Sequence, residues 1–470
     1  MQFNTYLFAC FFAVVLAVHH APLPWTARKL ALLGFSYAFY AAWDPAFVVL
    51  LWGSTVVDWF AARAMMRTER PALRRALLGA SLVFNLGLLG YFKYAGFLQR
   101  TLAAVLGALG VHLAVAPVDI VLPIGISFYT FMTLSYTIDV YLGRSRPARS
   151  FLDYALYVTF FPHLVSGPIV RATELVPQFE TERRATGPQL GWGLALLAVG
   201  LFQKVVLADG LLAPVVDKVF QPRLAQLSTG DAWAGAVAFA GQIFFDFAGY
   251  SSCAIGVALC LGFALPDNFR APYGAVGISD FWRRWHMSLS SWLRDYLYIP
   301  LGGNRRGALR THVNLALTML IGGLWHGASW TFVAWGGLHG GYLIAERLLR
   351  AAAPASPLWS TRAVQLALAL ATFILVCFAW VFFRAVSFDQ AFRILAAMLG
   401  RGRGAGHPAW WLAILPVAAL VAVHWRMRAT TFETVVERCP WPVRSALLAA
   451  AVVSLFLSSG IDRAFIYFQF

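Results

Sequence analysis

The sequence predicts an all-α polytopic membrane protein, and the prediction rests on its apolar composition, its long apolar runs and the placement of its arginines. Of the 470 residues, 60% are hydrophobic and 12% are charged, with a mean hydropathy of +0.67. Soluble domains carry about 25% charged residues, so this chain cannot cover a water-facing surface with polar groups. We therefore expect one membrane domain over residues 1–470 rather than several soluble domains.

Apolar runs recur along the whole chain at lengths that suit spanning helices, which need about 20 mostly apolar residues. Some runs are short or contain Pro or Gly, as in half-helices and re-entrant segments that protein encloses. We therefore expect about 11 to 13 transmembrane helices. The candidate spans are Phe3–Val18, Leu30–Trp43, Phe47–Ala64, Ala76–Phe97, Ile120–Leu142, Tyr154–Ile169, Leu190–Leu207, Ala232–Phe263, Val313–Trp325, Trp330–Ile344, Val364–Phe383, Trp411–His424 and Ala446–Ser459.

The charge balance is basic, with 37 Lys and Arg against 21 Asp and Glu and a net charge of +16. Such an excess can indicate nucleic-acid binding, but the apolar composition argues against it and favours membrane lipid as the surroundings. Loop arginines mark the cytoplasmic side of a membrane protein. The cluster Arg63–Arg75 follows the third predicted span and so predicts an extracytoplasmic N-terminus. The run Phe3–Val18 lacks a basic flank, so we expect a retained span rather than a cleaved signal peptide.

The cysteines predict neither a disulfide framework nor a metal site. The sequence contains five, and no two of them form a CxxC pair. Four lie in or beside apolar runs, and Cys253 and Cys260 are typical of small core residues. The five are Cys10, Cys253, Cys260, Cys377 and Cys439.

The stretch Gly277–Arg310 differs from the rest of the chain because arginines and aromatic residues alternate in it. A helix through it would carry one apolar stripe at 3-4-3-4 spacing. That pattern predicts re-entrant or interfacial helices near residues 278–300, and a purely anchoring surface helix would satisfy it equally. The stripe consists of Trp282, Trp285, Leu289, Trp292 and Tyr296.

A glycine-rich turn with cationic side chains follows this stretch. Gly302 and Gly303 allow a sharp turn, and Asn304, Arg305 and Arg306 come directly after them. Arginine forks bind phosphate or carboxylate groups. The same residues would also suit an ordinary cytoplasmic turn.

His326 is the strongest single candidate for chemistry. A helix that starts near Arg310 would place it about 24 Å along its axis, inside an apolar layer about 30 Å thick. An ionisable residue at that depth is costly and usually functional, although a hydrogen bond between helices would also explain it. Gly322, Gly323 and Gly327 permit close approach of other backbone or of a thin substrate.

A second histidine lies within reach of the first. His286 precedes His326 by 40 residues, and a surface helix, a turn and an inward helix could bring the two together. Two histidines at one site can divide acid and base work between them. His312 and His339 are weaker candidates, as is His163, which sits in a Pro-broken apolar stretch that could line a cavity.

Several segments resemble the membrane-bound O-acyltransferase family. DFWRRWHMSLSSWLRDYLYIPLGGNR at 280–305 and LWHGASWTFVAWGGLHG at 324–340 are similar to two signature blocks of its bacterial branch that acetylates alginate and related exopolysaccharides. Two segments of the N-terminal half also resemble that branch, namely LPIGISFYTFMTLSYTIDVYLG at 122–143 and FFPHLVSGPIVR at 160–171. The resemblance covers most of the chain.

The resemblance implies a ring of helices around a central funnel, with a catalytic core over about residues 120–345. It implies that His326 is the essential histidine and that His286 occupies a position where distant members carry Asn or Asp. It also implies that the tail motif at 465–470 ends a polysaccharide-acylating enzyme. Tyr467 in that motif is a candidate acyl carrier or, alternatively, an interfacial aromatic residue.

From this resemblance we expect an acetyltransferase of the bacterial inner membrane that takes acetyl-CoA from the cytoplasm and holds no permanently bound cofactor. The acceptor would be an exported, alginate-like polysaccharide, served by an extracytoplasmic esterase-like partner. Alternatives are a polytopic transporter or flippase, or an acyltransferase for peptidoglycan, cellulose or teichoic acid. The expected donor-binding residues are Arg305, Arg306, Asn304 and Arg284, and the expected funnel-lining residues are Trp285, Trp325, Ser329 and His163.

Overall fold

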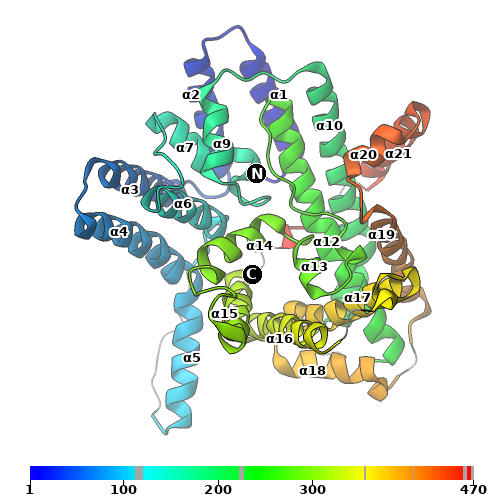
Figure 1. Cartoon of the computed structure of the whole chain (residues 1–470). Coiled ribbons are helices and arrows are strands. Elements are labelled where there is room, and N and C mark those ends of the chain that lie inside the picture. The colour runs from blue at the N-terminus through cyan, green and yellow to red at the C-terminus, as the bar shows by residue number, and fades with distance from the viewer. Residues whose placement is uncertain (112–119, 222–226, 354–355, 405, 459–462, 467–470) are drawn as a thin grey trace. The chain divides into compact units, whose positions relative to one another are not determined.

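A computed structural model describes residues 1–111, 120–221, 227–353, 356–404, 406–458 and 463–466. All regular secondary structure within these residues is helical, which confirms the predicted all-α class (Figure 1). The chain forms two compact units. The first comprises Met1–Leu197 and Cys253–Pro266, and the second comprises Ala198–Ser252 and Asp267–Phe470.

The first unit contains short and long helices from the N-terminal half. They are α1 Tyr6–His20, α2 Trp25–Ala41, η1 Pro45–Phe47, α3 Val48–Arg67, α4 Pro71–Leu89, η2 Gly90–Tyr94, α5 Ala95–Ala108, α6 Ile126–Tyr141, α7 Phe151–Thr159, α8 Phe161–Leu164, α9 Ala172–Glu180 and most of α10 Gly187–Leu201. The end of α12 also belongs to this unit.

The second unit contains the remaining helices. They are η3 Phe202–Leu212, α11 Ala213–Val219, most of α12 Thr229–Cys260, η4 Pro272–Gly274, α13 Ile278–Trp282, α14 Met287–Leu293, η5 Arg294–Tyr298, α15 Gly307–His326, α16 Trp330–Ala352, η6 Pro357–Ser360, α17 Arg362–Arg384, α18 Phe388–Ala396, η7 Ala397–Arg401, η8 Pro408–Ala413, α19 Ile414–Met427, α20 Phe432–Arg438 and α21 Trp441–Leu457.

Among the described residues, six helical stretches are long and apolar enough to cross a membrane, which agrees with the predicted polytopic fold. Two shorter apolar helices, α1 and α21, add to them. The predicted ring around a funnel stays a prediction. The six stretches are Pro45–Arg67, Pro71–Ala108, Gly187–Val219, Thr229–Cys260, Arg362–Arg384 and Trp410–Met427.

Two predicted elements differ from the structure. Tyr154–Ile169 is not one span, because the helix breaks at Phe160 and ends at Leu164. The stretch 278–300 holds short helices, as expected, but they do not form one continuous helix. The break falls at His286, whose backbone φ is +44°.

The packing of the first unit centres on α3, α4 and α6, which lie side by side (Figure 1). Asp58 of α3 accepts hydrogen bonds from Ser81 Oγ at 2.5 Å and from Asn85 Nδ2 at 3.0 Å, both on α4. Thr133 of α6 donates to Asn85 Oδ1 at 3.3 Å. These buried polar groups satisfy one another between apolar helices.

In the second unit, α15 and α16 pack against each other with their backbones in contact. A Cβ added at Gly323 would lie 2.3 Å from the carbonyl oxygen of Phe332, and one at Gly336 would lie 2.2 Å from that of Met319. Glycine is therefore required on both helices at this crossing. The crossing holds the end of α15, and with it His326, against the start of α16.

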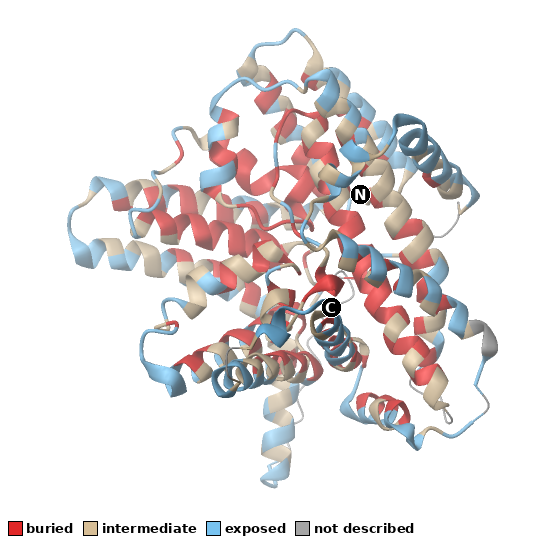
Figure 2. Ribbon diagram, turned by 45° about the vertical axis from the view of Figure 1, so that its right-hand side comes forward, coloured by how far each residue is buried: buried red, intermediate tan, exposed pale blue. Residues whose placement is uncertain are grey.

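The exposed side chains suit a lipid environment. Buried residues, red in Figure 2, gather where the helices of each unit face one another. Large apolar side chains are exposed on many helices, which water would penalise and lipid tails would not. Examples are Tyr6, Val83, Leu309, Leu447 and Leu457.

Candidate active site

His326 is the last residue of α15, where the chain turns back into α16. Gly327 follows in extended conformation, and a Cβ there would lie 2.2 Å from the ring of Phe332. Ser329 caps α16 by accepting a hydrogen bond from the backbone N–H of Thr331 at 3.3 Å. The imidazole is thus placed by a helix end, a tight connection and a helix start.

Aromatic rings surround the His326 side chain, which is only 3% exposed. Its ring centroid lies 5.0 Å from that of Trp325, 5.0 Å from that of Trp335 on α16 and 5.3 Å from that of Phe383 on α17. Such rings exclude water and hold the imidazole in one orientation. Any group that reaches this imidazole would meet a dry, apolar environment.

His286 lies in the break between α13 and α14, fully buried. Its Nδ1 is 3.1 Å from Asn268 Oδ1, and Asn268 Nδ2 donates to Ser251 Oγ at 3.2 Å. In this arrangement the amide NH₂ of Asn268 faces Ser251 and its Oδ1 faces the histidine. Because Oδ1 can only accept, Nδ1 of His286 carries the proton and Nε2 is an acceptor.

Burial keeps His286 neutral. Desolvation lowers the pKa of its imidazole from 6.5 to about 3. At neutral pH the ring therefore offers a lone pair on Nε2 rather than a positive charge. Ser288 Oγ donates to the same Asn268 oxygen at 2.9 Å, which reinforces this tautomer.

The structure brings the two predicted histidines together. The ring centroids of His286 and His326 are 6.4 Å apart, with an interplanar angle of 59°. Trp325 is in contact with both, with its ring centroid 5.9 Å from that of His286 and 5.0 Å from that of His326, so the three rings form a triangle. The pair forms a compact cluster in the second unit with two imidazoles and one indole.

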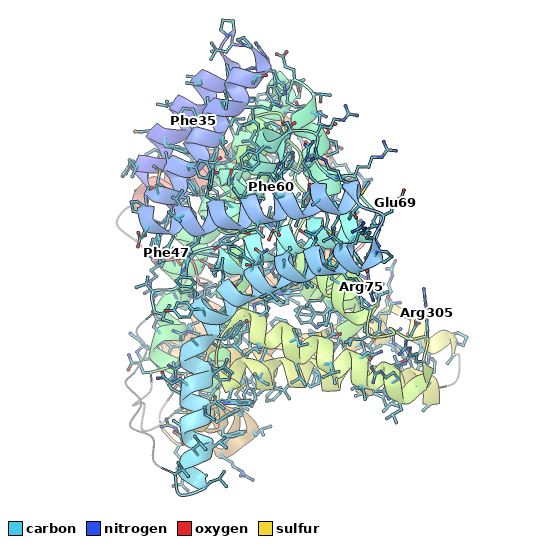
Figure 3. All side chains as sticks on the ribbon, turned by 90° about the vertical axis from the view of Figure 1, so that its left-hand side faces the viewer. Phe35, Phe47, Phe60, Glu69, Arg75 and Arg305 are labelled. Carbon is cyan, nitrogen blue, oxygen red and sulfur yellow. The ribbon has the colours of Figure 1, made fainter. Side chains whose placement is uncertain are left out.

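The predicted donor-binding turn lies at the other end of α15. Asn304, Arg305 and Arg306 are exposed, and Asn314 Nδ2 pins the turn by donating to the carbonyl of Gly303 at 2.9 Å. Figure 3 shows Arg305 at the end of the α15–α16 pair where α15 begins. A 20-residue helix is about 30 Å long, so this turn and His326 are separated by the length of α15.

Arg284 and Trp285 have structural contacts that sequence reasoning did not anticipate. Arg284 Nε pairs with Asp280 Oδ2 at 3.0 Å, and Nη1 donates to the carbonyl of Arg428 at 2.9 Å. Trp285 is fully buried, with its ring centroid 5.1 Å from that of Trp380. Both residues fasten the segment before His286.

Two further candidates do not belong to the described residues of the second unit. His163 belongs to α8 in the first unit, where it is fully buried. Within the described part of the chain, neither of its ring nitrogens has a hydrogen-bond partner. Tyr467 lies outside the described residues.

Sequence reasoning missed Asn268 and undervalued His339. Asn268 sits in a loop 18 residues before His286, and nothing in the local sequence indicates the pairing. His339 Nδ1 accepts a hydrogen bond from Trp282 Nε1 at 3.3 Å, and its ring lies 4.9 Å from that of Trp335. The available sequence signal was its position about one helical turn after Trp335 in α16, among the aromatic residues of the 324–340 block.

Comparison with known proteins gives consistent results. A family model described as MBOAT, membrane-bound O-acyltransferase family, matches residues 144–388. The probable alginate O-acetylase AlgI of Azotobacter vinelandii is 44% identical over 85% of this chain and 78% of its own length. The Pseudomonas aeruginosa protein of that name is 45% identical over 80% of this chain and 70% of its own.

A relative named for a different acceptor covers a similar share of this chain. The peptidoglycan O-acetyltransferase of Helicobacter pylori is 38% identical over 79% of this chain and 74% of its own length. The matched segment of the family model includes His286, His326 and the turn at 304–306. All of the cluster described above therefore lies within the segment that the family model matches.

Proposed function

Because the chain belongs to the membrane-bound O-acyltransferase family and is an O-acyltransferase with many membrane-spanning helices, we propose that it moves acetyl groups from acetyl-CoA to hydroxyls of an exported, alginate-like polysaccharide. The observation that carries this proposal is the buried pair His286 and His326 around Trp325. The relatives named as alginate O-acetylases support this acceptor, and the relative named for peptidoglycan is the second candidate.

In the proposed reaction, His326 acts as general base on the acceptor hydroxyl. The hydroxyl oxygen attacks the thioester carbonyl carbon, a new C–O bond forms, and the C–S bond of the donor breaks. His326 takes the hydroxyl proton and returns it to the leaving thiolate, so the histidine is unchanged after one turnover. Positioned proton transfer of this kind contributes about 10²–10⁴-fold to a rate.

His286 is proposed to act as an acceptor rather than as a donor. Its proton is on Nδ1, bound to Asn268, so Nε2 can hold an N–H or O–H in place. That geometry favours orienting His326 or the acceptor hydroxyl over donating to the thioester oxygen. His286 is thus a positioning partner in this scheme.

The donor is proposed to enter from the cytoplasm, with its phosphates on Arg305, Arg306 and Asn304. These side chains are exposed, and the turn that carries them is separated from His326 by the length of α15. Only a long, thin donor can contact both ends, which is compatible with a phosphate group and an acyl thioester joined by a flexible arm. Tyr467 as acyl carrier and an esterase-like partner outside the membrane remain parts of the proposal.

The substitution His326→Ala tests the proposal. We expect polymer acetylation to fall at least about 100-fold, since the general base is lost. The measurement is acetyl content of the exported polymer, with membrane insertion quantified in the same cells. His312→Ala is the matched control, because His312 lies on the same helix near its other end. Acetylation at the wild-type level in a correctly inserted His326→Ala protein would remove this histidine from the chemistry.

A further inference from the structure

Three buried charges in the second unit have no part in the proposed reaction. Lys204 Nζ lies 3.0 Å from Asp209 Oδ1 and forms an ion pair with Asp246. All three side chains are buried, on helices apolar enough to span a membrane. Charges in such helices are costly and indicate a function. Two carboxylates facing one ammonium group also leave oxygen atoms able to accept further hydrogen bonds.

The backbone of the C-terminal segment forms hydrogen bonds with these charged side chains. The backbone N–H of Ile466 donates to Asp246 Oδ2 at 2.9 Å, and Lys204 Nζ donates to the carbonyl of Ala464 at 3.4 Å. Residues 463–465 are not helical, so their backbone groups need partners from elsewhere in a dry environment. Both contacts are made to the backbone and therefore fix the path of the chain.

The side chain of Phe465 lies between these two contacts and packs on a ring that contacts His286. Phe465 is 1% exposed, and its ring centroid lies 4.7 Å from that of Tyr250 and 5.7 Å from that of Phe247. Phe247 in turn lies 4.7 Å from His286. One aromatic ring thus separates the docked chain end from His286.

A second ion pair holds the segment at its other end. Arg463 pairs with Asp217, which also pairs with Arg384 Nη2 at 3.2 Å. These groups are partly exposed, so this attachment is weaker than the buried one. The segment 463–466 is therefore held at two points, with the stronger one beside the histidine pair.

We propose that Lys204, Asp209 and Asp246 form a dock that positions the C-terminal segment 463–466 next to His286. The catalytic consequence of docking rests on the function proposed above, whereas docking itself does not. The three residues are positioning residues, since none of them contacts the histidines. The chain continues from Ile466 directly into residue 467, so the dock sets the point from which the last residues start.

Cysteine labelling in membranes tests the dock with the full chain. The parent carries Phe465→Cys together with Cys10→Ser and Cys439→Ser, which removes the two cysteines that are not buried. We expect slow maleimide labelling in the parent. With Asp246→Ala added, labelling should rise at least about tenfold, which corresponds to ~1.4 kcal/mol of docking free energy. Equal labelling in parent and variant, or fast labelling in the parent, would overturn the dock.

Two further measurements separate undocking from misfolding. Cys377 is fully buried on α17, and its continued protection shows that the second unit is folded. Ile466→Pro deletes the N–H that donates to Asp246 and leaves the side chains of Lys204, Asp209 and Asp246 unchanged, so it should expose Phe465→Cys as well. Ile466→Val keeps that N–H and should keep the protection. Protection in Ile466→Pro would contradict the proposal even if Asp246→Ala misfolds.

The same variants distinguish the dock from the proposed reaction. His326→Ala should abolish acetylation and leave the labelling of Phe465→Cys unchanged. Ile466→Pro should lower acetylation, and Ile466→Val should restore it. Wild-type acetylation in a labelled Ile466→Pro protein would refute the positioning role. Wild-type acetylation in His326→Ala would refute the reaction scheme and leave the labelling result standing.

Discussion

At residue 286 the backbone φ of +44° places a histidine in the left-handed region, which residues other than glycine and asparagine rarely adopt. This conformation ends the preceding helical turn and directs the side chain to Asn268. The ring is then buried and its pKa lowered to about 3. The position of the second histidine thus depends on one unusual dihedral angle, its tautomer on Asn268 and its neutral charge on burial.

This burial has a consequence for stability at low pH. Between the unfolded pKa of 6.5 and the folded value, the unfolded chain binds a proton at residue 286 that the folded chain does not. The free energy of unfolding therefore falls as pH decreases, by about 1.4 kcal/mol per pH unit for one such group. Above pH 6.5 neither state binds this proton, so residue 286 no longer lowers the free energy of unfolding.

His286→Asn should remove that one proton from the pH dependence. Asparagine tolerates positive φ, so the backbone break can persist. We expect the unfolding free energy of the variant in detergent to fall less steeply between pH 6 and 4. The slope should be smaller by about 1.4 kcal/mol per pH unit, which corresponds to one proton. An unchanged slope would mean that His286 is already protonated in the folded state.

Among the elements, the α15–α16 pair is the part of the second unit on which the site depends most. Gly323 and Gly336 allow the two backbones to touch, and small residues at such crossings are typical of helices packed in membranes. His326 lies at the end of one helix, and Trp335 and His339 lie on the other. Close helix packing therefore sets the geometry of the aromatic cage.

Gly336→Ala should destabilise this pair, because the new Cβ would lie 2.2 Å from the carbonyl oxygen of Met319. Forcing an extra methyl group into a packed interior costs about 1–3 kcal/mol, so the melting temperature of purified protein should fall. Gly341→Ala is the control on the same helix, because nothing lies within 4 Å of its Cβ position. Equal melting temperatures for the two variants would show that the crossing can relax.

At the scale of the whole molecule, the distribution of charge predicts how the chain lies in the membrane. Figure 3 shows Glu69 and Arg75 at one end of the α3–α4 hairpin and Phe47 at the other. The basic end is expected in the cytoplasm, and if the three spans predicted up to this point all cross the membrane, the N-terminus lies outside. The orientation remains part of our proposal.

Labelling of intact cells tests that orientation. In the background without Cys10 and Cys439, we expect Glu69→Cys to be protected from a membrane-impermeant maleimide and Ala46→Cys to react. The two positions lie at opposite ends of the α3 helix, so they report on opposite sides. The reverse pattern would place the N-terminus in the cytoplasm.

Much of the molecule could be predicted from its sequence, because composition determines the environment and a histidine deep in an apolar run is rare. His326 could be named in advance for that reason, and His286 because a surface helix, a turn and an inward helix could bring it close to His326. The bond from His286 to Asn268 could not, because it depends on a loop closing over 18 residues. The dock could not be predicted either, because Lys204 and Asp246 form an ion pair only through tertiary packing.

The glycine crossing of α15 and α16 also limits how the site can move. Two helices whose main chains touch cannot slide or rotate past each other without collision, since packed interiors shift between discrete arrangements rather than deform smoothly. If α15 and α16 move, they therefore have to move together as one rigid body. Any opening that admits a substrate to His326 therefore has to occur in the segments that pack around the pair, and not by movement of α15 against α16.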